Sequence, residues 1–191
     1  MINHKYKFIF VHIDKTAGTS LLNAINPELT IYSDGHRLKG KHNAIDYYIK
    51  GEPNHHEYFK FAFIRNPFDR ALSKYFHHFH RPNVGHAIER KASELNFNEW
   101  VSIGGLKPFR QQWLYIYMND NLAVDFIGKF ENLQEDFNVV CDKIDIPQKQ
   151  LFCKNKSKHK HYTEYYDDES RKIVAEKYAK DIEYFGYEFG E

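Results

Sequence analysis

A lysine, two threonines and a serine gather in a short loop near the N-terminus, where their donors could hold an anion. The loop, Asp14-Lys15-Thr16-Ala17-Gly18-Thr19-Ser20, separates the β-prone run Phe8–Ile13 from the helix-favouring residues Leu21–Ile25. A loop that leads from a strand into a helix presents backbone N–H groups at the positive end of the helix dipole. The sequence therefore predicts a site for a phosphate-like group. It is not a Walker A loop, because Gly18 follows Lys15 instead of preceding it.

A second set of donors follows the β-prone run Phe59–Ile64. Arg65 ends this run, and Ser73 lies within two turns of a predicted helix, where a guanidinium fork and a hydroxyl could reach one further phosphate. Asn66 and Pro67 predict the start of that helix, because asparagine is a favoured N-cap and proline is tolerated at the first helical position. Two anion sites on neighbouring loops predict a ligand with two separated anionic groups.

These loops need a scaffold of strands that alternate with helices. A further strand is predicted at Val124–Gly128, and Leu29–Tyr32 is another candidate. Such alternation predicts an α/β fold with a mainly parallel sheet that is flanked by helices on both faces. Ligands of such sheets bind at the carboxyl ends of the strands, where both anion loops lie.

Helices are expected over most of the remaining sequence. They are predicted at Asn43–Lys50, at Phe68–His80, around Trp100, around Trp113, after Asn132, and from Asp168 with Val174, Tyr178 and Ile182 along one stripe. Asn132 to Glu135 has the pattern of a capping box, and the spacing of the apolar residues behind it predicts that Cys141 is in the core. The polar stretch 81–94 is the candidate for a mobile or acceptor-facing insertion.

Length and composition exclude several classes of protein. The 191 residues fit one domain, so residues 1–191 are expected to form a single domain. The 27 basic and 26 acidic residues nearly balance, which argues against a dedicated binder of nucleic acid or of a membrane surface. No apolar run is long enough for a signal peptide or a membrane span, so a soluble, cytoplasmic protein is expected. Cys141 and Cys153 match neither a metal motif nor a disulfide framework.

The two anion loops resemble, in order and separation, motifs of sulfotransferases related to heparan sulfate 2-O-sulfotransferase and to small bacterial carbohydrate sulfotransferases. Phe10–Ser20 resembles the loop that holds the 5′-phosphosulfate of the donor PAPS, and Phe63–Ser73 resembles the 3′-phosphate motif. Asp125–Asn132 and Asn155–Tyr187 are similar to two further family segments, so the resemblance covers nearly the whole chain. It implies a P-loop-like sulfotransferase fold, PAPS as donor, PAP as product and no required metal.

The resemblance also implies roles for particular residues. Lys15 would contact the bridging and leaving phosphate oxygens, and Arg65 and Ser73 would hold the 3′-phosphate. The family usually has proline where this chain has Asp14, whose carboxylate we expect to point away from the anion. The cradle of the 5′-phosphosulfate would comprise Lys15, Thr16, Ala17, Gly18, Thr19 and Ser20. A basic tract that resembles a loop closing over the donor adds Lys156, Ser157 and Lys158.

Sulfuryl transfer needs a base for the acceptor hydroxyl, and histidine is the natural candidate among twelve in this chain. We favour His42, because it lies between the two phosphate motifs where related enzymes carry a catalytic histidine. His36 is the alternative, and its neighbour Arg37 could meet an anionic acceptor. His12 lies inside the first predicted strand and is expected to be structural. Three more histidines, His77, His78 and His80, point in different directions from one helix and lack an obvious carboxylate partner, which disfavours a metal site.

The acceptor and the class of activity leave alternatives open. The resemblance favours a carbohydrate hydroxyl, but a tyrosine, a lipid headgroup or a small metabolite would suit the same chemistry. A nucleotide kinase would need Mg²⁺ and ATP, and no Walker-type lysine or pair of magnesium carboxylates supports that function. A non-catalytic module for nucleotides or polyanions would bind PAP without turnover. The sequence specifies neither the acceptor nor the oligomeric state.

Overall fold

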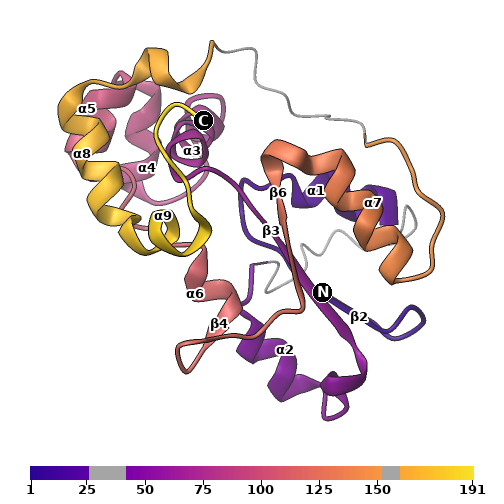
Figure 1. The fold of residues 1–191 in the computed structure, drawn as a ribbon. Helices are drawn as coiled ribbons and strands as arrows, with labels where there is room; N and C mark the ends of the chain where they lie inside the picture. The colour runs from indigo at the N-terminus through magenta and orange to yellow at the C-terminus, as the bar shows by residue number, and fades with distance from the viewer. Residues whose placement is uncertain (26–41, 152–159) are drawn as a thin grey trace. The chain divides into compact units, whose positions relative to one another are not determined.

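The computed structural model of the chain describes residues 1–25, 42–151 and 160–191. The chain divides into two compact units, and each is built from two stretches of sequence. The first unit comprises Met1–Arg65 with Leu114–Asn155, and the second comprises Asn66–Trp113 with Lys156–Glu191. Figure 1 shows the main sheet in the first unit and the helices labelled α3, α5 and α8 in the second.

A four-stranded sheet in the order β1-β2-β3-β6 forms the centre of the first unit. Its strands are β1 (Ile2–Asn3), β2 (Phe8–Val11), β3 (Phe59–Ile64) and β6 (Phe126–Lys129). β2, β3 and β6 run parallel, whereas β1 is antiparallel to β2. The predicted α/β class with a mainly parallel sheet is confirmed, as are the three strands predicted within the described residues. The candidate strand Leu29–Tyr32 lies outside them.

Both faces of this sheet are covered at β2, as the full burial of all four of its residues shows. One face packs against α1 (Gly18–Ile25) and α7 (Leu133–Lys143), which Figure 1 shows side by side. Alternate strand residues point to opposite faces, so Ile9 and Val11 fill the other side. The aromatic side chains on the α1/α7 face are Phe8, Phe10, Phe61 and Phe63.

The rest of the first unit consists of short elements. They are α2 (Ile45–Gly51), η1 (His55–Glu57), β4 (Tyr117–Met118), β5 (Asn121–Leu122) and η3 (Phe130–Asn132). One more helix, α6 (Trp113–Ile116), begins at the last residue of the first stretch of the second unit.

The start of α7 differs from the prediction, whereas its core face agrees with it. The predicted capping box is wrong, because Asn132 makes no side-chain cap bond. The turn η3 runs directly into α7, and the ψ of 35° at Asn132 is far from the extended backbone of a capping residue. The carboxylate of Asp136 instead accepts a hydrogen bond from the Lys129 N–H at 2.6 Å. Cys141 is fully buried, which confirms that it belongs to the core.

Helices make up the second unit. They are α3 (Pro67–Phe79), α4 (Ala87–Arg90), η2 (Lys91–Ser93), α5 (Phe97–Ser102), η4 (Tyr162–Tyr165), α8 (Asp168–Lys177) and α9 (Ala179–Phe185). The predicted start of α3 is confirmed, because the Asn66 side chain accepts a hydrogen bond from the Phe68 N–H and Pro67 is the first helical residue. The helix that continues from β3 therefore begins within two residues of Arg65.

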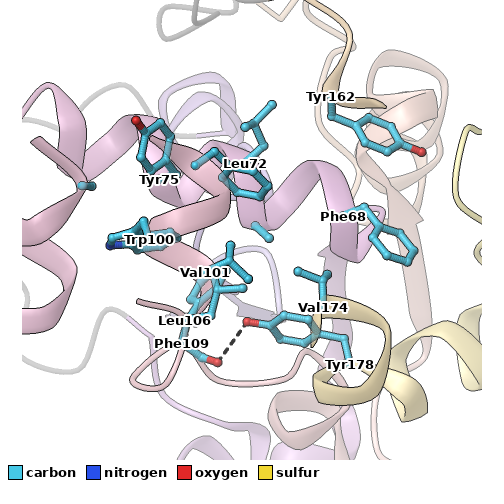
Figure 2. Packing of buried hydrophobic residues seen from close by; sticks show 13 residues of the cluster. Phe68, Leu72, Tyr75, Trp100, Val101, Leu106, Phe109, Tyr162, Val174 and Tyr178 are labelled. Atoms are coloured by element: carbon cyan, nitrogen blue, oxygen red, sulfur yellow. Dashed lines mark hydrogen bonds between the residues drawn. The ribbon is translucent and has the colours of Figure 1, made fainter. Parts of the chain in front are cut away.

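The C-terminal helix is interrupted at a residue that lies in the core of the second unit. Trp100, Val174 and Tyr178 are at most 1% exposed within a cluster contributed mainly by α3, α5 and α8. Figure 2 shows the Tyr178 hydroxyl pointing toward Phe109, to whose carbonyl it donates at 3.2 Å. The single helix predicted along Val174, Tyr178 and Ile182 is wrong, because Tyr178 lies between α8 and α9 with a non-helical ψ of 23°.

The segment 81–94, expected to be a mobile or acceptor-facing insertion, contains α4 and η2. A buried carboxylate of this segment forms ion pairs with α3. The Glu89 carboxylate is 3% exposed and lies 3.1 Å from Lys74 Nζ and 3.2 Å from His78 Nε2. Burial would raise the pKa of Glu89, but the His86 N–H and the charges of Lys74 and His78 outweigh it and hold that pKa below its usual value. These contacts hold the segment on α3, and a role toward the acceptor stays a prediction.

Candidate active site

The loop between β2 and α1 has a backbone that ordinary residues rarely adopt. Lys15 and Ala17 have φ values of 67° and 63°, in the left-handed region that disfavours side chains other than glycine. The buried Thr16 hydroxyl donates to the Ile13 carbonyl at 2.9 Å and closes the turn. Left-handed residues recur in backbone concavities whose N–H groups bind anions, and such strain concentrates at functional sites. The loop thus has the conformation expected of an anion cradle.

Gly18 begins α1 and allows the imidazole of His12 to pack directly on the loop. A Cβ at this position would lie 2.0 Å from His12 Cδ2. The His12 ring, 4% exposed, stacks on Phe10 at 5.6 Å and lies 4.6 Å from the ring of His42, measured between centroids. The prediction that His12 is structural fits this position, in which its ring supports the base of the loop.

Replacement of Gly18 by alanine is therefore expected to destabilise the protein by about 1–3 kcal/mol, because the enclosed His12 ring has little room to move aside. Urea denaturation measures the loss. Gly51→Ala is the matched control, since no atom lies within 4 Å of its added Cβ, and it should stay within about 0.5 kcal/mol of the unchanged protein. Equal stability of the two variants would show that the packing of His12 against Gly18 is not restrictive.

His42 lies beside the same loop, three residues before α2 begins at Ile45. Its Nδ1 is 3.0 Å from the backbone oxygen of His12. A carbonyl oxygen can only accept, so Nδ1 carries the hydrogen and donates it. In the neutral ring this leaves Nε2 as the nitrogen that accepts a proton. The exposed imidazole is thus oriented by the residue that directly follows β2 and leads into the anion loop.

Arg65 connects the two predicted anion motifs. It directly follows β3, is 9% exposed, and donates from Nη1 to the Lys15 carbonyl at 3.3 Å. Its guanidinium lies over the ring of Phe130, with 3.9 Å between Cζ and the ring centroid. Phe130 was missed by the sequence analysis, although it sits inside the third family-like segment. The predicted strand ends at Gly128, whereas β6 extends to Lys129, so only the structure shows that Phe130 follows its strand directly as Arg65 follows β3.

The structure brings together Lys15–Ser20, His42 and Arg65 within the first unit. Ser73 lies half-buried on α3 in the second unit, so its joint action with Arg65 stays a prediction. The other predicted contacts fall outside the described residues; they are His36, Arg37, Lys156, Ser157 and Lys158. Within residues 1–25, 42–151 and 160–191, no group of three histidine, cysteine or acidic side chains is arranged to hold a metal ion. The expectation that the histidine run on α3 lacks a carboxylate partner is wrong for His78, whose Nε2 lies 3.2 Å from the Glu89 carboxylate and whose Nδ1 lies 2.9 Å from the Val84 carbonyl.

Sequence comparison identifies the family to which this scaffold belongs. The statistical model of the Sulfotransferase family matches residues 1–188. The chain belongs to the sulfotransferase family. This match includes both anion loops and the segment after β6, and it confirms the resemblance stated from the motifs.

Over the part of the chain that the structure describes, no helix has the length and apolar character needed to cross a membrane.

Relatives within the sulfotransferase family include several named as carbohydrate sulfotransferases. The chain is 24% identical over 227 residues to carbohydrate sulfotransferase 14 of Danio rerio, with 98% of the chain and 61% of the relative aligned. Carbohydrate sulfotransferase 11 of Rattus norvegicus is 24% identical, covering 73% of the chain and 51% of the relative. Carbohydrate sulfotransferase 9 of Homo sapiens is 25% identical, covering 78% and 36%. The chain thus spans about a third to three fifths of these relatives, and no solved structure matches it significantly.

Proposed function

We propose that this protein transfers a sulfuryl group from PAPS to an acceptor hydroxyl. The observation that carries the proposal is the meeting of three features at the carboxyl end of parallel strands: the strained loop Lys15–Ser20, the guanidinium of Arg65 and the imidazole of His42. Ligands of α/β sheets bind at this edge. The proposal includes a P-loop-like fold in which residues 1–191 act as one sulfotransferase domain.

The donor would be held at its two anionic ends. Lys15 and the N–H groups of Thr16–Ser20 bind the 5′-phosphosulfate, aided by the N-terminus of α1. Arg65 binds the 3′-phosphate through its planar fork of donors, with Ser73 as a further donor. Lys156, Ser157 and Lys158 are proposed as further contacts to the nucleotide, from the resemblance of their tract to a family segment. No metal is needed, because lysine, arginine and backbone donors supply the positive field.

The chemical step assigns His42 the general base and Lys15 the stabilisation of the leaving group. His42 takes the acceptor proton on Nε2, since its Nδ1–H is engaged by the His12 carbonyl. The acceptor oxygen forms its bond to sulfur as the bond from sulfur to the bridging oxygen breaks, and the electron pair leaves with the phosphate of PAP. Lys15 neutralises the negative charge that develops on that phosphate.

A carbohydrate is the proposed acceptor, and the names of the relatives support this choice. His36 and Arg37 remain candidates to meet the acceptor, with Arg37 suited to an anionic sugar. The proposed location is the cytoplasm. The proposal involves neither nucleic acid nor a membrane span.

PAP is expected to stabilise the protein against heat without Mg²⁺, by about 2.7 kcal/mol at a hundredfold excess over its dissociation constant. The reason is that both phosphate sites exist only in the folded chain. Differential scanning calorimetry measures the shift, with ATP and Mg²⁺ as the comparison ligand. A shift with ATP and Mg²⁺ but none with PAP would contradict the sulfotransferase proposal and favour a kinase.

Turnover is then tested with PAPS labelled in its sulfuryl group and a panel of carbohydrate, phenol and lipid acceptors. Transfer of label to a carbohydrate supports the whole proposal. Transfer to another acceptor class corrects the substrate alone. PAP binding without transfer to any acceptor would indicate a nucleotide-binding module.

A further inference from the structure

Phe130 has no part in the proposed reaction, yet its ring lies against Arg65. The register of the sheet explains why: Ile64 of β3 is the partner of Lys129 of β6, so the residues that follow them leave the sheet side by side. Those residues are Arg65 and Phe130, and 3.9 Å separates the guanidinium carbon from the ring centroid. The contact joins residues 65 positions apart in the sequence.

This contact restrains the guanidinium over the Phe130 ring. A guanidinium over an aromatic ring is attracted by the negative face of that ring, which restrains the position of the arginine side chain. Arg65 Nη1 also donates to the Lys15 carbonyl at 3.3 Å. The Arg65 side chain is therefore held by two contacts, the Phe130 ring and the Lys15 carbonyl. Holding a long side chain before a ligand arrives reduces the entropy lost on binding.

We infer that Phe130 is a positioning residue for the nucleotide: its ring holds the Arg65 guanidinium in the orientation that receives the 3′-phosphate. The inference rests on the proposed function, because it takes PAP as the ligand of Arg65. The three groups in contact come from the ends of three adjacent parallel strands. The Lys15 carbonyl follows β2, Arg65 follows β3, and Phe130 follows β6.

The test compares PAP with adenosine 5′-phosphate, which differs from it by the missing 3′-phosphate. Isothermal titration calorimetry gives the dissociation constants of both nucleotides. The constant for adenosine 5′-phosphate divided by the constant for PAP reports how much the 3′-phosphate contributes to affinity. Phe130→Leu should reduce this ratio by about 3- to 30-fold, the range of a partly buried cation–π contact. Phe130→Tyr keeps an aromatic face and should keep the ratio. If Phe130→Leu folds poorly, Phe130→Met replaces it with a longer apolar side chain.

Two controls separate positioning from a general structural effect. Phe126→Leu removes a partly buried ring from β6 that packs near Phe59, and it should leave the ratio unchanged. In an Arg65→Ala background, Phe130→Leu should have no further effect on the ratio, because its influence passes through the guanidinium.

The outcomes are distinguishable. A ratio that Phe130→Leu leaves unchanged overturns the inference, and so does an equal loss of affinity for both nucleotides, which would place the ring against the shared adenosine. Absence of PAP binding by the unchanged protein overturns the proposed function itself.

Discussion

Replacing His42 with alanine is expected to lower turnover by about 10²- to 10⁴-fold, the usual contribution of a positioned general base. PAP affinity should stay nearly unchanged, because His42 is assigned to the acceptor and not to the nucleotide. The orientation of the ring is the physical basis, since Nδ1–H donates to the His12 carbonyl and leaves Nε2 to take the proton. Initial rates with labelled PAPS and calorimetry with PAP measure the two quantities separately.

The pH dependence provides a second measurement of the same role. A protonated imidazole cannot accept a proton, so the rate should fall as the pH drops and His42 becomes protonated. The residual rate of His42→Ala should lack this acidic limb. His56→Ala is the matched control, because His56 is an exposed histidine on η1, and it should keep both the rate and the limb. Near-normal turnover of His42→Ala together with loss in His36→Ala would move the base to His36.

The elements that position the site could be predicted because their signals are local. Phe59–Ile64 is a β-prone run that becomes β3 with the predicted bounds, and Asn66 with Pro67 fixes the start of α3. Tyr178 shows where local signals fail. Its spacing fits a helical stripe, but its hydroxyl bonds the Phe109 carbonyl, 69 residues away, and the helix breaks there. The two-unit division likewise depends on contacts between distant stretches of chain.

For the candidate site, the sequence indicates the chemical groups but not the contacts that orient them. Lysine, hydroxyls and a glycine before a helix predict an anion loop, and the loop is found with Lys15 and Ala17 in left-handed conformations that no residue type signalled. The contact of His42 with the His12 carbonyl spans 30 residues. The stack of Phe130 on Arg65 depends on the pairing of β3 with β6. Residue types thus indicate which groups do chemistry, whereas strand register determines which side chains orient them.

Arg65→Ala is expected to weaken PAP binding by about 10- to 150-fold, which corresponds to about 1.5–3 kcal/mol for a hydrogen bond to a charged group. The same substitution also removes the bond from Nη1 to the Lys15 carbonyl, which supports the loop proposed to hold the other end of the nucleotide. A bond to a neutral acceptor contributes only about 0.5–1.5 kcal/mol, so affinity for adenosine 5′-phosphate should fall by about 2- to 12-fold.

The difference between these two losses identifies what Arg65 binds. If the guanidinium meets the 3′-phosphate, the charged interaction outweighs the loss of loop support, and PAP loses more affinity than adenosine 5′-phosphate in calorimetric titrations. Arg90→Ala removes an exposed arginine on α4 that donates to the Gly85 carbonyl, and it should change neither affinity. Equal losses for both nucleotides in Arg65→Ala would mean that this residue acts only through Lys15, and the 3′-phosphate would then have to be held by other donors.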